Sequence, residues 1–309
     1  MNEKLVILVG GTGHLGGRVL RALKAENATV RCLVRSSTAK EKRSWLKQYA
    51  TEITEVDFTD VSAIAKACEG GHVVLSTLSG LRDVIVDLQK SILTAAIHAG
   101  VPRFIPSDFA IDYRPIPQGE NRNLNLREEF RQILDTSSIK ATSILNGAFM
   151  DMLTGVAPYI LFPIRRVLCW GNPDQLMDFT LIDDVAKYTA KATLDPTTPR
   201  YLKIAGDVVS ANDLAGIMTE LTGKKHKVLR PGGLDAFKRV IKLTKLLTPD
   251  RGQIFPAWQG MQYMHSSLKG DSKFKELDNN RYKMKWTTVR ELLDDFLHNK
   301  DFVKYKVSD

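Results

Sequence analysis

Eight residues near the start of the chain, GGTGHLGG at positions 10–17, follow the apolar run KLVILV. Their glycines fit two spacings, GxGxxG through Gly11, Gly13 and Gly16, or GxxGxxG through Gly10, Gly13 and Gly16. Glycine lets a backbone turn tightly and approach a ligand closely, and the N–H groups at the start of a following helix face negative charge. A loop of this kind between a strand and a helix predicts a site for the pyrophosphate of a dinucleotide.

The residue that distinguishes NAD from NADP is expected at the end of the second apolar run, TVRCLVRSS. NAD sites usually place Asp or Glu there to accept from the ribose hydroxyls, whereas this chain has Arg35 followed by Ser36. A guanidinium and a hydroxyl suit a 2′-phosphate. Lys40, Lys42 and Arg43 add positive charge nearby, although each could equally belong to a solvated helix face. The pattern predicts NADP(H) rather than NAD(H).

A common acid–base pair of nicotinamide-dependent dehydrogenases, YxxxK, is missing from this sequence. A YxxxK pair does not occur, since Tyr113 has Pro117 four places on and no other tyrosine has a lysine there. Cys32, Cys68 and Cys169 lie far apart among apolar neighbours, so we expect buried free thiols. No Cys or His spacing fits a metal, and no metal site is predicted.

The elements that position these residues alternate along the first half of the chain. Strand-like runs (KLVILV, TVRCLV, EITEVDF, HVVLST, RFIPS and KATSIL) are separated by segments of helical period. Such alternation predicts an α/β fold, a Rossmann-type doubly wound parallel sheet. We place this NADP-binding domain at residues 1–153, with returning segments near 165–205, and a smaller, mostly helical substrate-binding region at 154–309. Asp60 is expected to cap one helix, and Gly100 to end another.

Seven motifs in order along the chain resemble the NmrA-like and isoflavone-reductase-like group of atypical short-chain dehydrogenases. They are GGTGHLGG, LVRSS, VDFTD, VVLSTLSG, RFIPSDF, FTLIDDVAKYTAKA and KMKWTTVRELLDDFL. The resemblance implies NADP(H) on a Rossmann domain, with a substrate pocket between it and a smaller C-terminal domain. The cofactor-binding residues predicted from the glycine loop, the second strand and the resemblance are Gly10, Thr12, Gly13, His14, Leu15, Gly16, Arg35, Ser36, Lys42, Thr77, Leu78, Ser79 and Ser107. The residues predicted for the substrate pocket are Asp108, Phe109, Asn121, Asn146 and Phe149.

At one position the chain departs from the reductases that it resembles. Those enzymes use a lysine as their proton-handling residue, and this chain has Asn121 at the matching place, with no lysine between Lys90 and Lys140. Arg122 and Arg127 are no substitutes, because guanidinium keeps its proton at neutral pH. An isolated carbonyl or a benzylic ether needs a proton as hydride arrives, whereas a quinone spreads the added charge and can take protons from water.

These observations favour an NADPH-dependent oxidoreductase that passes hydride to a quinone-like or other conjugated aromatic acceptor. The segment ILNGAF supports this interpretation, since it looks more like the quinone oxidoreductases of the group. Asp108 and Asn146 could orient the acceptor or a water, or equally form strand-end hydrogen bonds to loop backbone. The alternatives are a non-catalytic NADP(H) sensor of the NmrA type, with a protein partner, and an aromatic reductase with a substitute proton donor.

Composition limits the remaining classes. The 309 residues carry a net charge of +9, which fits a phosphate-binding enzyme without requiring nucleic acid, and no nucleic-acid partner is expected. Charged residues and prolines interrupt the most apolar window, at 147–170, so no membrane span is predicted. The chain begins without a signal-peptide pattern, which predicts a cytoplasmic protein.

The basic amphipathic segment DAFKRVIKLTKLL is expected to cover its own core, with contact to an acidic partner or a membrane surface as the alternative.

Overall fold

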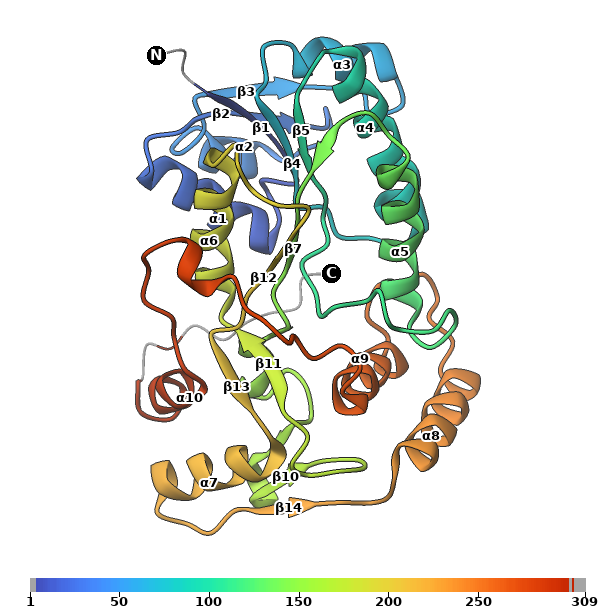
Figure 1. The fold of residues 1–309 in the computed structure, drawn as a ribbon, viewed down its shortest axis with the longest axis vertical. Helices are drawn as coiled ribbons and strands as arrows, with labels where there is room; N and C mark the ends of the chain where they lie inside the picture. The colour runs from blue at the N-terminus through green and yellow to red at the C-terminus, as the bar shows by residue number, and fades with distance from the viewer. Residues whose placement is uncertain (1–3, 300–301, 303–309) are drawn as a thin grey trace. The chain divides into compact units, whose positions relative to one another are not determined.

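The computed structural model describes residues 4–299 and 302, drawn in Figure 1, and the predicted domain limits at residues 1 and 309 lie outside them. The chain forms two compact units. The first contains the residues up to Phe109 together with Leu126–Ile144 and Val185–Leu202, and the second contains Ala110–Asn125, Leu145–Asp184 and the residues from Lys203 onward. The chain passes from one unit to the other several times, so no single boundary residue separates them.

The first unit is built on a six-stranded parallel sheet in the order β3-β2-β1-β4-β5-β6. Its strands are β1 (Leu5–Val9), β2 (Thr29–Val34), β3 (Glu52–Glu55), β4 (Val73–Ser76), β5 (Arg103–Ile105) and β6 (Lys140–Ala141). Val6 of the central strand pairs with Val30 on one side and Val73 on the other. The strand order reverses between β1 and β4, and ligands of such sheets bind at the carboxyl ends of the strands at this point. The predicted doubly wound α/β fold is confirmed.

Helices cover both faces of this sheet, as Figure 1 shows. They are α1 (His14–Ala25), α2 (Lys40–Leu46), α3 (Val61–Cys68), η1 (Asp83–Leu88), α4 (Gln89–His98), α5 (Arg122–Asp135) and α6 (Ile182–Leu194). The helix η1 continues directly into α4. The first residues of α5 and of α6 belong to the second unit. On one face, Ile7 and Phe104 of the sheet share a core with Ile92 and Phe130 of the helices. The predicted cap is present, because the Asp60 carboxylate accepts from the N–H of Ser62 at 2.8 Å.

The second unit combines helices with short strands. One sheet joins β8 (Ala148–Phe149), β11 (Met177–Thr180) and β13 (Asp207–Val209), and another joins β9 (Ile160–Leu161), β10 (Arg166–Leu168) and β14 (Lys227–Leu229). The helices are α7 (Ala211–Thr222), α8 (Leu234–Leu247), α9 (Ala257–Lys269) and α10 (Val289–His298), with short 3₁₀ turns η2 (Met150–Thr154), η3 (Phe162–Ile164) and η4 (Asn279–Arg281). Strands β7 (Ser143–Leu145) and β12 (Tyr201–Lys203) form a separate pair. Phe179, Val167 and Leu214 are buried in the core of this unit.

The three cysteines are buried and free, as predicted. Burial raises the pKa of Cys32 to about 12, which keeps its thiol protonated. Within the described ranges, no helix has both the length and the apolar character that crossing a bilayer requires.

Candidate functional site

The glycine loop after β1 has the geometry of the GxxGxxG spacing. Gly10 leaves the strand with φ +89°, and a Cβ atom built on it would lie 2.8 Å from Oγ1 of Thr77. A Cβ atom on Gly16 would lie 2.1 Å from the carbonyl oxygen of Gly10, and the N–H of Gly13 donates to that same oxygen at 2.9 Å. Gly11 is less restricted, since its Cβ would meet nothing nearer than the side chain of Leu8 at 3.2 Å. Gly10 and Gly16 therefore have to be glycines.

The loop leads into the first turn of α1. Gly13 is the N-cap of this helix, no side chain caps it, and its first turn has no acidic residue. The first backbone N–H groups of a helix have no partner within the helix, and they carry the positive end of the helix dipole. Thr12, His14 and Leu15 are partly exposed along the loop. The arrangement suits a diphosphate, as predicted from the spacing.

A second loop, at the end of β4, is fixed beside the first. Thr77 donates to the carbonyl oxygen of Val9 through its N–H at 2.9 Å and through its hydroxyl at 3.0 Å. The hydroxyl of Ser107 donates to the carbonyl oxygen of Leu78 at 2.6 Å, and its N–H donates to the side-chain oxygen of Gln89 at 3.0 Å. The ends of β1, β4 and β5 are thereby connected, which brings the predicted residues at 77–79 and 107 together.

Gln89 is a positioning residue that the sequence analysis missed. It is fully buried, and its amide also donates to the carbonyl oxygen of Ile85 at 2.6 Å. The available signal was a lone amide side chain within the apolar helical segment DVIVDLQKSIL.

The loop after β2 presents the residues predicted to select NADP(H). Arg35 and Ser36 are exposed there, and Lys42 is exposed on α2. The guanidinium of Arg43 donates to the carbonyl oxygens of Ser36 at 2.5 Å and Arg35 at 3.1 Å, and it pairs with Glu55 at the end of β3. Arg43 therefore fixes the backbone of this loop, and its charge is balanced by a carboxylate instead of adding to a phosphate site. The exposed cations of this region are Arg35 on the loop and Lys40 and Lys42 on α2.

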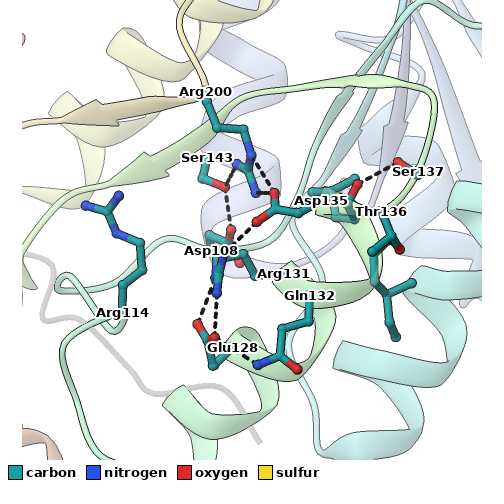
Figure 2. Close-up of polar contacts among 12 residues, drawn as sticks. Asp108, Arg114, Glu128, Arg131, Gln132, Asp135, Thr136, Ser137, Ser143 and Arg200 are labelled. Atoms are coloured by element: carbon teal, nitrogen blue, oxygen red, sulfur yellow. Dashed lines mark hydrogen bonds and ion pairs between the residues drawn. The ribbon is translucent and has the colours of Figure 1, made fainter.

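Asp108 follows Ser107 and is held in a chain of polar side chains (Figure 2). The hydroxyl of Ser143 donates to Asp108 at 2.6 Å and accepts from Arg200 at 2.6 Å. Arg200 pairs with Asp135 at 2.7 Å, and Asp135 pairs with Arg131 at 2.5 Å. Asp108 is only 1% exposed. These contacts fix its carboxylate in the fold, with the side chain of Ser143 as one of its partners.

Phe109 is the next residue along the chain. It is buried, and it is the last residue of the N-terminal segment of the first unit.

Asn121, at the place of the family lysine, lies in the second unit as a helix cap. Its side-chain oxygen accepts from the N–H of Leu124 in the first turn of α5 at 3.2 Å and from the amide of Gln259 on α9 at 2.9 Å. Its amide nitrogen donates to the hydroxyl of Ser266 at 3.4 Å. Asn121 is fully buried. The side chain thus joins the start of α5 to α9, a role that a lysine could not fill because an ammonium group has no acceptor.

Asn146 and Phe149 flank a tight connection in the same unit. Gly147 has φ +65°, and a Cβ atom on it would lie 2.3 Å from the carbonyl oxygen of Asp178. The backbone oxygen of Asn146 accepts from the hydroxyl of Thr180 at 2.7 Å, while its buried side-chain oxygen has no hydrogen-bond partner among the described residues. Phe149 is partly buried in β8. Asn146 thus offers an acceptor that the fold leaves open.

His265 on α9 is a further buried polar group of this unit that the sequence analysis missed. It is 2% exposed, and its Nε2 has no hydrogen-bond partner within the described part of the chain. Desolvation, followed by the positive charge of Lys238, lowers the pKa of His265 below its usual value, with Glu120 opposing and Lys269 reinforcing the shift. The ring is therefore neutral at neutral pH.

Known proteins resemble this chain over most of its length. A family model described as the NmrA-like family matches residues 2–293. Pinoresinol reductase 1 of Arabidopsis thaliana is 29% identical over 301 residues, which cover 89% of this chain and 95% of that protein. The phenylcoumaran benzylic ether reductase IRL1 of Ginkgo biloba is 26% identical over 320 residues, which cover 96% of this chain and all 100% of that protein.

Solved structures resemble the chain as well. A structure of AtPrR2 with NADP+ and (+)pinoresinol has a TM-score of 0.80 at 24% identity, covering 96% of this chain and 99% of that one. A binary complex of leucoanthocyanidin reductase and NADPH from Vitis vinifera has a TM-score of 0.78 at 18% identity, covering 95% and 99%. At these identities the likeness establishes a shared fold.

Proposed function

Because the chain belongs to the NmrA-like family, we propose that it is an NADPH-dependent reductase of conjugated aromatic small molecules, with quinone-like compounds as its favoured acceptors. The family resemblance of the seven sequence motifs is confirmed by the match over residues 2–293. Relatives named for the reduction of pinoresinol and of phenylcoumaran benzylic ethers support an aromatic substrate.

The chain binds NADP(H), as do the AtPrR2 and leucoanthocyanidin reductase structures that hold NADP+ and NADPH. The residues present fit this cofactor. The glycine loop has no space for a Cβ atom at Gly10 or Gly16, and it leads into α1, whose N-terminus no side chain caps. In our proposal the first turn of α1 holds the diphosphate, Arg35 and Ser36 hold the 2′-phosphate, and the loop after β4 holds the nicotinamide end. When bound, NADPH supplies hydride.

The observation that carries the choice of acceptor is the replacement of a proton-handling lysine by the buried cap Asn121. A carboxamide does not exchange its N–H protons with substrate as a general acid does, and both polar atoms of Asn121 already have partners in the fold. Without an acid at this place, the reduction of a benzylic ether loses a contribution of roughly a hundredfold or more. A quinone is less affected, because its oxygens can take protons from water. The chain's own contribution is to bind and orient the reactants.

A panel of acceptors tests this proposal. Purified protein is mixed with NADPH and either a naphthoquinone, a benzylic ether such as pinoresinol, or an isoflavone, and the loss of NADPH absorbance is followed. We expect turnover with the quinone and little or none with the ether. In Asn121→Lys the ether should gain activity relative to the quinone, whereas the matched variant Asn121→Asp, which keeps a capping oxygen, should not.

Two results would contradict the proposal. Reduction of the ether by the unmodified protein at a rate similar to that of the quinone would mean that another group donates the proton. Tight binding of NADPH without turnover of any acceptor would instead favour a non-catalytic NADP(H) sensor with a protein partner. Action in the cytoplasm remains a prediction from the sequence.

A further inference from the structure

Helix α8 (Leu234–Leu247) exposes more apolar side chains than it buries. Its buried residues are Phe237 and Ile241. Leu243, Leu246 and Leu247 are 57%, 79% and 69% exposed. At 100° per residue Leu243 and Leu246 lie opposite the two buried residues, and Leu247 lies between that side and Phe237. Only part of the predicted amphipathic face therefore covers the core, and a second apolar face points to solvent. Val240, at the edge of that face, is also exposed.

The cations of α8 divide into two groups. Lys238 pairs with Glu120 at 2.8 Å, and the ammonium of Lys245 lies 4.8 Å from the ring centre of Trp258, so both contribute to packing within the second unit. Arg239 and Lys242 are exposed on the side of the leucines, and neither has an ion pair in the described part of the chain. We call Arg239, Val240, Lys242, Leu243, Leu246 and Leu247 the outer face of α8. The exposed carboxylate of Asp235 lies on the same side, in the first turn of the helix.

The helix is held to the second unit while its outer face stays accessible. Besides the Lys238–Glu120 pair, Arg122 binds the segment that follows α8 through Asp250 at 2.7 Å and through the carbonyl oxygen of Ile254 at 2.7 Å. Phe255, next in this segment, is 45% exposed. The apolar outer face therefore belongs to a helix fixed at both ends, not to a detached segment.

We propose that the outer face of α8 binds the surface of an anionic lipid membrane, a function beyond the proposed reductase activity. A contiguous exposed apolar patch on a folded protein usually marks a contact surface. A helix whose exposed face carries leucines and cations lies in the plane of a membrane interface, with the leucines among the acyl chains and the long cationic side chains reaching the headgroups. A helix of 14 residues is too short to span the bilayer.

Charge complementarity favours a lipid surface over a second copy of the chain. A symmetric contact would place the outer faces of two copies against each other and bring Arg239 and Lys242 of both copies into one interface. Like charges in contact destabilise an interface. An anionic bilayer provides opposite charge and an apolar layer together, and the net charge of +9 adds to the attraction.

Vesicle co-sedimentation tests the proposal with the full chain. Vesicles of phosphatidylcholine containing about 30% phosphatidylglycerol are compared with vesicles of phosphatidylcholine alone. We expect binding to the anionic vesicles that weakens as salt is added, and little binding to the neutral ones. The double variant Leu243→Asp/Leu246→Asp should lower the partition coefficient by about tenfold or more, since each leucine loses its burial in lipid. Leu176→Asp/Leu277→Asp, at two exposed leucines outside α8, adds the same two carboxylates and is the matched control.

A charge pair separates the outer face from net charge alone. Arg239→Glu/Lys242→Glu should weaken binding by about tenfold or more, whereas Lys66→Glu/Lys90→Glu on α3 and α4, which changes net charge equally, should weaken it far less. NADPH binding and circular dichroism confirm that each variant is folded. Equal binding to both vesicle types, no binding, or equal losses in the two charge variants would overturn the proposal. So would light scattering that shows a dimer lost in Leu243→Asp/Leu246→Asp, with no vesicle binding, since the face would then belong to a second copy.

Discussion

A methyl group added at Gly16 should remove NADPH binding while leaving most of the fold intact. The Cβ atom of Gly16→Ala would lie 2.1 Å from the carbonyl oxygen of Gly10 and 2.5 Å from the hydroxyl of Thr77. Carbon and oxygen atoms in contact are normally more than 3 Å apart, so the loop must move by roughly 1 Å. Overpacking of this kind destabilises a protein by about 1–3 kcal/mol. A shift of about 1 Å in a preorganised anion site weakens binding by roughly a hundredfold.

Calorimetric titration with NADPH measures this effect, and urea unfolding measures the accompanying loss of stability. Gly216→Ala is the matched control, because it makes the same change in the interior of α7, where a Cβ atom meets nothing within 4 Å. It should leave the affinity unchanged and raise stability by up to about 1 kcal/mol, since alanine favours a helix over glycine. If Gly16→Ala binds NADPH as tightly as the unmodified protein does, the glycine loop is not the diphosphate site.

Three further predictions concern other parts of the structure. Arg35→Asp should weaken NADPH binding by roughly a hundredfold and NADH binding far less, because the 2′-phosphate loses a charge-assisted contact and gains a repulsion. Calorimetry measures both affinities, and Lys66→Asp is the control for net charge. Similar losses for the two cofactors would contradict the assignment of Arg35 to the 2′-phosphate. Ser143→Ala should destabilise the protein by about 1–3 kcal/mol in urea unfolding, because the buried carboxylate of Asp108 loses a hydrogen-bond donor, and a loss no larger than that of Ser91→Ala at the surface would refute it. The pKa of His265 is lowered in the folded state. Between that pKa and about 6.5 the unfolded chain therefore binds more protons than the folded one, and the free energy of unfolding falls as pH falls. His265→Gln should flatten this dependence in urea unfolding measured at several pH values, and an unchanged slope would show that other groups cause it.

Local patterns in the sequence were sufficient to predict the parallel sheet and the glycine loop after β1. The strand runs are apolar because both sheet faces are covered, and the tightest contact of Gly16 is with Gly10, six residues earlier in the same loop. Asp60 caps α3 through a residue only two places away. Each of these features depends on neighbours in the chain, and sequence periodicity reports them directly.

Contacts between distant residues explain what sequence patterns did not show. Asn121 is a cap held by Gln259, 138 residues away, and Ser143 is held by Arg200, 57 residues away. The strands β8 and β9 have two residues each, too few for any periodic signal. Arg43 lies in a charged segment that is typical of a solvated helix face, yet its guanidinium donates to carbonyl oxygens of the loop after β2, which only the fold brings to it.

The amphipathic pattern of α8 was interpreted correctly for one face only. Phe237 and Ile241 are buried, as expected for a helix that covers its own core, whereas Val240 and Leu247 of the same predicted stripe are exposed. Contact with an acidic partner or a membrane surface was the alternative expectation for this segment, and membrane contact is our proposal for its exposed face.

The central claim is that this chain holds NADPH and lets hydride pass to an acceptor that needs no proton from the protein. Single-turnover oxidation of NADPH carrying deuterium at C4 of the nicotinamide, followed by stopped flow with a naphthoquinone, tests it most directly. We expect oxidation that is slowed by the deuterium and whose rate is nearly constant from about pH 6 to about pH 9, since no side chain acts as an acid. No oxidation, or a rate that follows the ionisation of one protein group, would contradict it.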